Sequence, residues 1–285
     1  MSEKIKGLIW NVVLYTVSFC VGFVLFGMIE NVFLAEAVLT AAATLVIYIV
    51  TCFVPDTSLY DPYWSVAPVA MIAAAMIKYS YFSVNAFILF GAVLIWAVRL
   101  TVNWAVTYKG LLHEDWRYRM YREKTGPFGF AFINLVGLQF VPTIVVYAGL
   151  VGAFFILQTG GFSPAILPGI AVMMLGVGLE FFSDRAIHRF LRENKVPGKT
   201  CDISLWKYSR HPNYLGEMTF WTGIFIAFLG VRPDIWYFGL GFLLIIALFI
   251  FVSIPLMEKH NMERRTDYAE YKSRTSALLI LPNKR

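Results

Sequence analysis

The densest group of hydrogen-bonding side chains in the sequence stands directly before an apolar segment. Within the stretch Leu205–Gly223, five such residues fall in eight positions: Arg210, His211, Asn213, Tyr214 and Glu217. The apolar run Met218–Val231 follows at once, so these groups would lie at the mouth of a membrane helix. Polar groups at that depth are costly unless a ligand or partner satisfies them, so we interpret the stretch as a binding site. The alternative is a basic loop beside the membrane, with Pro212 at the first position of the next helix.

A second group of polar residues recurs at intervals of four. Glu180, Asp184 and His188 would share one face of a helix that leaves the membrane. The same segment also contains three arginines: Arg185, Arg189 and Arg192. Carboxylates can bind ribose hydroxyls while arginines bind phosphate, so the group favours a nucleotide site. The alternative is a solvated helix end held by i,i+4 ion pairs, and no glycine-rich dinucleotide or phosphate-binding loop is present.

Two further charged residues stand in apolar surroundings. Arg99 lies eight residues before Thr107, the end of an apolar run, with Asn103 on the same helical face. It would clamp a phosphate or form an ion pair with Glu180 or Asp184. Asp61 would either cap the next helix or, where burial raises its pKa, stay protonated and donate to a carbonyl. Tyr63 is the next candidate proton donor, and His113–Arg119 is interpreted as a cofactor lid or interfacial loop.

The composition identifies the class of protein. Of 285 residues, 59% are hydrophobic and 15% charged, whereas a soluble domain has about 25% charged residues. We expect an all-α transmembrane bundle of seven or eight spans in one domain, residues 1–285, with the first helix retained. The three cysteines lack metal-ligand spacing, so neither a metal site nor a disulfide is indicated.

Eight apolar runs are near the length that crosses a bilayer. They are Leu8–Met28, Phe33–Val54, Trp64–Tyr79, Asn85–Thr107, Ala131–Leu157, Ala165–Phe182, Met218–Val231 and Ile235–Leu256. With eight spans, 21 of the 24 Lys and Arg residues fall on one side. This asymmetry predicts that both termini and the two long loops are cytoplasmic. It also accounts for the net charge of +6, so nucleic-acid binding is not expected.

Three motifs carry a resemblance to a known family. They are Glu180-Phe-Phe-Ser-Asp184, Ser209-Arg-His-Pro-Asn213-Tyr-Leu-Gly-Glu217 and the tail Glu263–Arg274 that ends at Leu281-Pro282. Over residues 60–282 the chain resembles the steroid 5α-reductase family, most closely its bacterial membrane members of unassigned substrate. The resemblance implies that residues 108–285 enclose NADPH while residues 1–107 hold an enone lipid. Hydride would pass to the β-carbon as an acid polarises the carbonyl.

The resemblance also implies roles for single residues. Asp184 and Asn213 match cofactor-binding residues of the family, and Arg99 matches a buried arginine near the phosphates. Less direct matches are Glu180, Asn103, His260 and Arg274, which with Arg192 and the residues of the Arg210–Glu217 group complete the expected cofactor set. The catalytic tyrosine is replaced by Trp96, and the Gln-Glu pair that grips the steroid ketone is missing. Asp61 and Tyr63 are therefore the expected catalytic residues, and the substrate is expected to be lipid or steroid-like.

Two alternative functions remain open. The sequence Arg210-His-Pro-Asn-Tyr214 also resembles isoprenylcysteine carboxyl methyltransferases, which use S-adenosylmethionine. The second alternative is a non-catalytic membrane protein, either one that binds lipid or a transporter. A transporter would be expected to show paired broken helices, which the sequence lacks. In each case we expect a monomer surrounded by membrane lipids.

Overall fold

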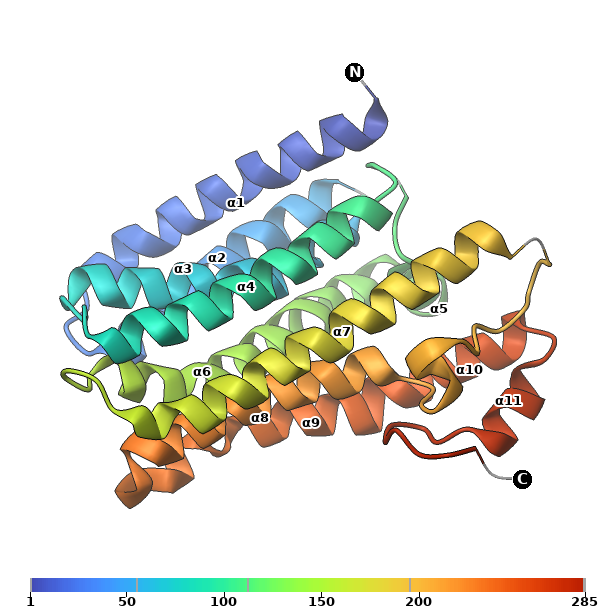
Figure 1. The fold of residues 1–285 in the computed structure, drawn as a ribbon. Helices are drawn as coiled ribbons and strands as arrows, with labels where there is room; N and C mark the ends of the chain where they lie inside the picture. Colours follow the sequence, from blue (N-terminus) through green and yellow to red (C-terminus); the bar gives the residue numbers. More distant parts are fainter. Residues whose placement is uncertain (1, 55, 112, 195, 284–285) are drawn as a thin grey trace. The chain divides into compact units, whose positions relative to one another are not determined.

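A computed structural model of the chain describes residues 2–54, 56–111, 113–194 and 196–283. Within these ranges every regular element is helical, apart from one isolated bridge between Ser209 and Ser276 (Figure 1). Seven helical segments are long and apolar enough to cross a membrane. They are α1 (Glu3–Gly27), α2 (Val32–Phe53), α4 (Val84–Thr107), the continuous segment Trp116–Leu157, the segment Pro164–Glu193, α8 (Pro212–Val231) and the segment Pro233–Arg264. The expected all-α, multi-pass membrane bundle is thereby confirmed.

The third apolar run forms a helix that is shorter than the others. This helix, α3 (Tyr63–Lys78), has 16 residues. At 1.5 Å per residue it is about 24 Å long, less than the hydrocarbon thickness of about 30 Å. Seven of the eight apolar runs therefore form candidate spans, and the third run forms the shorter helix α3. The side of the membrane on which the termini lie stays a prediction from the charge distribution.

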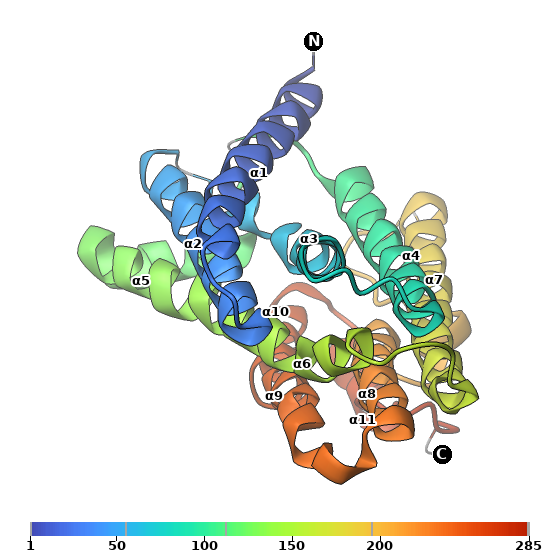
Figure 2. The ribbon, with the colours of Figure 1, turned by 90° about the vertical axis from the view of Figure 1, so that its left-hand side faces the viewer.

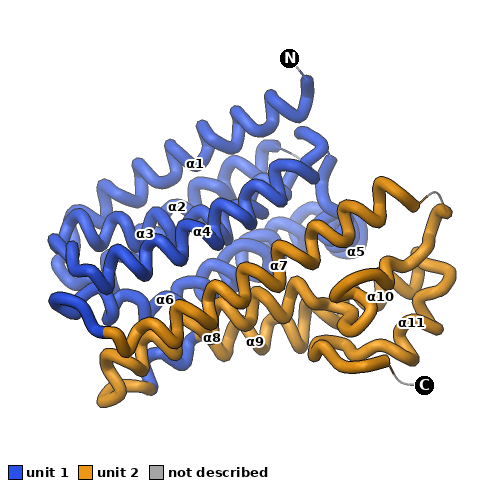
Figure 3. The backbone as a smooth tube through the Cα atoms, in the orientation of Figure 1, with its two compact units in different colours: residues 1–163, 237–241 blue, residues 164–236, 242–285 orange. Residues whose placement is uncertain are grey.

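The chain divides into two compact units (Figure 3). Unit 1 comprises residues 1–163 and 237–241. Besides α1–α4 it contains the short η1 (Thr57–Tyr60), α5 (Trp116–Ile133), the π-helical η2 (Asn134–Phe140) and α6 (Val141–Leu157). Helix α6 contacts α2, α3 and α4, and the core of the unit contains fully buried Leu39, Ile47, Met71, Trp96 and Phe154.

Unit 2 comprises residues 164–236 and 242–285. Its long helices are α7 (Leu167–Glu193) and α8, which lie side by side (Figure 2). The remaining elements are η3 (Pro164–Ile166), η4 (Ser204–Lys207), the start of η5 (Pro233–Gly241), α9 (Phe242–Leu248), the π-helical η6 (Phe249–Ser253), α10 (Ile254–Arg264) and α11 (Tyr268–Arg274). We expect residues 1–107 to bind the lipid and residues 108–285 to bind the cofactor. This division stays a prediction.

Glycines spaced seven residues apart let α7 and α8 approach closely. Gly169 and Gly176 lie on α7, while Gly216, Gly223 and Gly230 lie on α8. A methyl group built on Gly216 would lie 2.6 Å from Glu180 Cγ, and one on Gly223 would lie 2.5 Å from the backbone nitrogen of Met173. Small residues at such interfaces allow the backbones of membrane helices to pack together. Because Gly216 has no side chain, Glu180 can lie directly against the start of α8.

We expect Gly216→Ala to lower the free energy of unfolding by about 1–3 kcal/mol, because the added methyl group overpacks the α7–α8 contact. The matched control is Gly178→Ala on α7, where a methyl group would meet nothing within 4 Å. That change should raise the free energy by up to about 1 kcal/mol, because alanine favours a helix over glycine. Denaturation in detergent micelles measures both, and equal values for the two variants would contradict the close contact.

Candidate functional site

A buried carboxylate from α10 fixes Arg210 at the start of α8. Arg210 Nε donates to Glu258 Oε1 at 2.7 Å, and Arg210 Nη1 donates to the backbone oxygens of Lys272 and Thr275. Lys272 Nζ lies 2.7 Å from Glu258 Oε2. Two cations thus neutralise one carboxylate that is only 8% exposed. The Arg210 guanidinium fastens α8, α10 and the tail together, and its expected cofactor role stays a prediction.

His211 stands beside this cluster with one ring nitrogen available. The side chain is 3% exposed, and its ring stacks on Tyr214 at 5.3 Å, which in turn contacts Phe249 at 4.9 Å. His211 Nε2 lies 3.6 Å from Glu258 Oε1, beyond hydrogen-bond length, and has no hydrogen-bond partner among the described residues. Burial lowers the pKa of His211, and the nearby Glu258 only partly opposes this. The buried imidazole therefore favours its neutral form, with Nε2 not engaged in a hydrogen bond among the described residues.

Glu180 of α7 contacts the same end of α8, and Asp184 follows it on α7. Glu180 is 1% exposed and lies against Gly216, and Asp184 is half-buried one turn further along α7. Trp206 Nε1 donates to the backbone oxygen of Ser183 at 2.9 Å, which ties η4 to this part of α7. On α8, Asn213 is half-buried, and Glu217 Oε1 accepts a hydrogen bond of 3.0 Å from Trp221 Nε1. The predicted helical spacing of Glu180, Asp184 and His188 is confirmed, since all three lie on α7.

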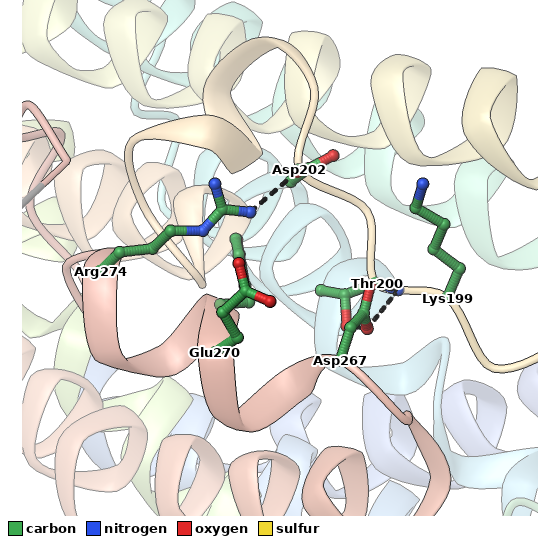
Figure 4. Close-up of a pocket in the computed structure, with 7 residues that line it drawn as sticks. Lys199, Thr200, Asp202, Asp267, Glu270 and Arg274 are labelled. Carbon is green, nitrogen blue, oxygen red and sulfur yellow. Dashed lines mark hydrogen bonds and ion pairs between the residues drawn. The ribbon is translucent and has the colours of Figure 1, made fainter. Parts of the chain in front are cut away.

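A separate cavity of about 210 Å³ lies between a loop and α11 (Figure 4). Its walls combine cations, carboxylates and hydroxyls: Lys199, Thr200, Asp202, Asp267, Glu270, Tyr271 and Arg274. Arg274 Nη2 donates to Asp202 Oδ2 at 3.1 Å, whereas Arg274 Nε is buried without a hydrogen bond in the described part of the chain. Thr200 donates from its backbone nitrogen and its hydroxyl to Asp267 Oδ1, at 2.9 and 2.5 Å. Arg274 thus lies in a polar cavity with hydrogen-bonding capacity to spare.

The cavity is connected to the start of α8 through Tyr271. Its hydroxyl donates to the backbone oxygen of Trp206 at 2.5 Å and lies 3.3 Å from that of Ser209. The other two predicted residues of unit 2 lie elsewhere: Arg192 is exposed in the last turn of α7, and His260 Nε2 is 3.3 Å from Arg264 Nη1. Sequence reasoning missed Glu258, Lys199 and Asp202, which no local pattern distinguishes from other charged residues.

In unit 1, Asp61 has the environment of a weak acid rather than of a helix cap. The residue before α3 is Pro62, and no side chain caps that helix, so the helix-cap alternative for Asp61 is wrong. Asp61 Oδ1 accepts a hydrogen bond from the Tyr118 hydroxyl and lies 3.8 Å from Arg117 Nη2. Burial raises the pKa of Asp61 to about 6, against the opposing effects of Arg117 and Tyr118. Tyr118 was missed because it lies far from Asp61 in the sequence.

The other predicted residues of unit 1 have different surroundings. The Tyr63 hydroxyl is buried and donates to the backbone oxygen of Thr40 at 2.9 Å, so its proton is engaged within the protein. Arg99 and Asn103 lie half-buried on α4, and Trp96 of the same helix is fully buried. The roles expected for Arg99 and Asn103 stay predictions.

The segment His113–Arg119, which is expected to form a lid or an interfacial loop, is hydrogen-bonded to the turn that precedes Asp61. Glu114 accepts hydrogen bonds from the Thr57 backbone nitrogen at 3.0 Å and from Arg122 Nη2 at 2.6 Å. The Asp115 backbone nitrogen donates to Ser58 Oγ at 2.8 Å, and α5 begins at the next residue, Trp116. These hydrogen bonds hold the segment against residues 57 and 58 and stabilise the turn that leads to Asp61.

Comparison with known proteins gives one match. A family model described as "Protein of unknown function (DUF1295)" matches residues 47–275, a range that contains every candidate site residue. No curated protein and no solved structure shows significant similarity to the chain.

Proposed function

The chain belongs to the DUF1295 family, a family of unknown function, and we propose that it is an NADPH-dependent membrane reductase. The substrate would be a lipid or steroid-like molecule with a carbon–carbon double bond conjugated to a carbonyl. The observation that carries the proposal is the polar cavity around Arg274, which Tyr271 joins to the backbone of Trp206 and Ser209, shortly before His211 in the chain.

The chemistry of the cavity fits one end of a dinucleotide. Arg274 and Lys199 can bind a phosphate, for which a guanidinium is the most suitable donor. Asp202 and Glu270 can accept hydrogen bonds from ribose hydroxyls. The cavity volume of about 210 Å³ is below the range of about 300–1,000 Å³ for a whole drug-sized ligand, so it would hold only part of the molecule. His211, Asn213 and Asp184 are the proposed contacts for the rest.

When bound, NADPH would supply a hydride equivalent, and the protein would supply binding groups and a proton. Asp61 is the proposed proton donor. With a pKa of about 6 it carries a proton in mildly acidic conditions and can stabilise negative charge that develops on a carbonyl oxygen. The proposed cytoplasmic position of both termini and of the cofactor residues rests on the distribution of Lys and Arg along the chain, and it requires α3 to count as an eighth crossing beside the seven candidate spans.

The methyltransferase alternative rests on the Arg210–Tyr214 motif and on the same acidic residues. Asp202 and Glu270 would also serve the ribose of S-adenosylmethionine. However, that cofactor carries a positive sulfonium, an ammonium group and a single carboxylate but no phosphate, so Arg274 and Lys199 would have only this one carboxylate to bind. The two cations favour the phosphate-bearing cofactor. A non-catalytic lipid-binding protein would need neither these cations nor the buried imidazole.

We expect NADPH to raise the melting temperature of the purified protein, and S-adenosylmethionine to leave it unchanged. A ligand that binds only the folded state stabilises it by about 2.7 kcal/mol at a hundredfold excess over Kd. Arg274→Leu should weaken NADPH binding about 10- to 100-fold, the effect of losing a hydrogen bond to a charged group. Binding is measured by the concentration dependence of the melting temperature.

The matched control for Arg274 is Arg189→Leu, which removes another guanidinium of unit 2. Arg189 is exposed and pairs with Glu193 at 3.0 Å, outside the cavity. It should leave the NADPH affinity unchanged. Stabilisation by S-adenosylmethionine but not by NADPH would replace the reductase with the methyltransferase. Stabilisation by neither nucleotide would favour the non-catalytic alternative.

A further inference from the structure

Unit 2 also contains an apolar groove of about 260 Å³ that the cofactor proposal does not use. It is lined by Val172 of α7, four residues of α8, Ile246 of α9, Ile250 of η6 and Leu278 of the tail. All except Leu278 belong to segments long and apolar enough to span a membrane. The lining is therefore apolar enough to face the hydrocarbon of a bilayer.

The walls of the groove are largely apolar. Its two hydroxyls, Thr219 and Thr222, donate to the backbone oxygens of Leu215 and Met218, each at 2.7 Å. Such bonds to the preceding helical turn use the hydroxyl hydrogens, so neither threonine has a free donor for a ligand. The part of a ligand that lies here must therefore be hydrocarbon.

One end of the groove reaches the Arg210–Tyr214 motif. Leu215 directly follows Tyr214 on α8, and the backbone oxygen of Leu278 accepts a hydrogen bond from Ser209 Oγ at 2.7 Å. The tail is further held by a bond of 2.9 Å from the Arg210 backbone nitrogen to the Ser276 oxygen. Ile250 lies in a π-helical turn, a distortion that is frequent at functional sites.

We propose that this groove binds one linear hydrocarbon chain of the lipid substrate and so presents the polar end of that lipid to the His211–Tyr214 region. The volume of about 260 Å³ is below the range of about 300–1,000 Å³ for pockets that enclose a drug-sized ligand, so the groove would hold one part of a lipid, and its apolar lining fits the hydrocarbon part. This inference rests on the proposed reductase function and names a flexible-chain lipid as the substrate class. It places the lipid chain on residues of unit 2, in place of the expectation that residues 1–107 hold the lipid.

The test is photolabelling of the full-length protein in lipid nanodiscs with a palmitic acid analogue that carries a diazirine on its chain. Val172→Trp and Ile246→Trp each place an indole in the groove. Their controls, Leu175→Trp and Leu244→Trp, add the same ring on the same helices at lipid-exposed positions, which are 58% and 48% exposed. The labelled positions are identified by mass spectrometry, and the melting temperature with NADPH is measured on the same preparations.

We expect the diazirine probe to label residues within Met218–Thr222. Excess palmitic acid should prevent this labelling, whereas a steroid should not. Val172→Trp and Ile246→Trp should reduce it about tenfold, equivalent to about 1.4 kcal/mol of binding, and the two controls should not. Labelling that spreads over all exposed apolar faces, or that persists in both groove variants, would overturn the proposal and identify bulk membrane lipid only. Specific labelling without stabilisation by NADPH would retain the groove and reject the reductase. Stabilisation by NADPH with unspecific labelling would do the reverse.

Discussion

Glu258→Ala is expected to lower the free energy of unfolding by about 3–5 kcal/mol, the cost of breaking a buried ion pair by removing one partner. The Arg210 side chain is only 9% exposed, and its carboxylate partner is Glu258. Without Glu258, the guanidinium would keep its bonds to the Lys272 and Thr275 backbones but lose its counter-charge. Equilibrium denaturation in mixed detergent micelles gives the free energy directly.

The matched control for this prediction is Glu263→Ala. Glu263 lies on the same helix, α10, but is exposed, so its removal should change the free energy by no more than about 0.5 kcal/mol. Glu258→Gln should fall between the two, because an amide oxygen still accepts from Arg210 Nε but carries no charge. If Glu258→Ala and Glu263→Ala are equally stable, Glu258 does not hold the tail on α8.

Asp61→Leu is expected to reduce turnover of an accepted enone lipid by about a hundredfold or more, since a donor at a developing oxyanion is worth about 2.7–4 kcal/mol of barrier. Asp61→Asn should retain part of the activity, because an amide still donates. Neither change should weaken NADPH binding, since Asp61 is proposed only as the proton donor. Steady-state kinetics for turnover and thermal shift for NADPH separate the two effects.

The pH dependence gives a sharper test of Asp61. Its pKa of about 6 means that the donor is present below that pH and is lost as the pH rises through it. Turnover should therefore fall above about pH 6 in the wild type and not in Asp61→Asn. The hydrogen bond from Tyr118 lowers the pKa of Asp61, so Tyr118→Phe should move the falling limb to higher pH. Equal turnover by Asp61→Asn and Asp61→Leu would remove Asp61 from the mechanism.

These expectations assign different tasks to residues that look alike in the sequence. Arg210 and Arg274 were both expected to bind the cofactor. Arg210 is surrounded by Glu258 and two backbone oxygens, whereas Arg274 faces a cavity with its Nε unbonded. Substitution of Arg210 should therefore act on stability first, while substitution of Arg274 should act on ligand binding.

The sequence by itself determined the helices and the local order of the polar residues. Hydropathy and length are properties of contiguous residues, so the apolar runs became the membrane helices, and intervals of four placed Glu180, Asp184 and His188 on one helix. The third run, Trp64–Tyr79, became α3 with its ends shifted by one residue, and this helix of 16 residues is too short to be among the candidate spans. The same reasoning also identified Asp61 as an acid in apolar surroundings, which its pKa of about 6 agrees with.

Only the tertiary structure decided which residues meet. Glu258 lies 48 residues from Arg210, and Tyr118 lies 57 residues from Asp61, separations at which no periodic pattern operates. The polar cavity joins residues 199–202 to residues 267–274, and the apolar groove joins α8 to Leu278, which follows α8 only after α9, α10 and α11. Such contacts depend on how whole helices pack, here on glycines that allow α7 and α8 to touch, and on the need of each buried charge for a partner.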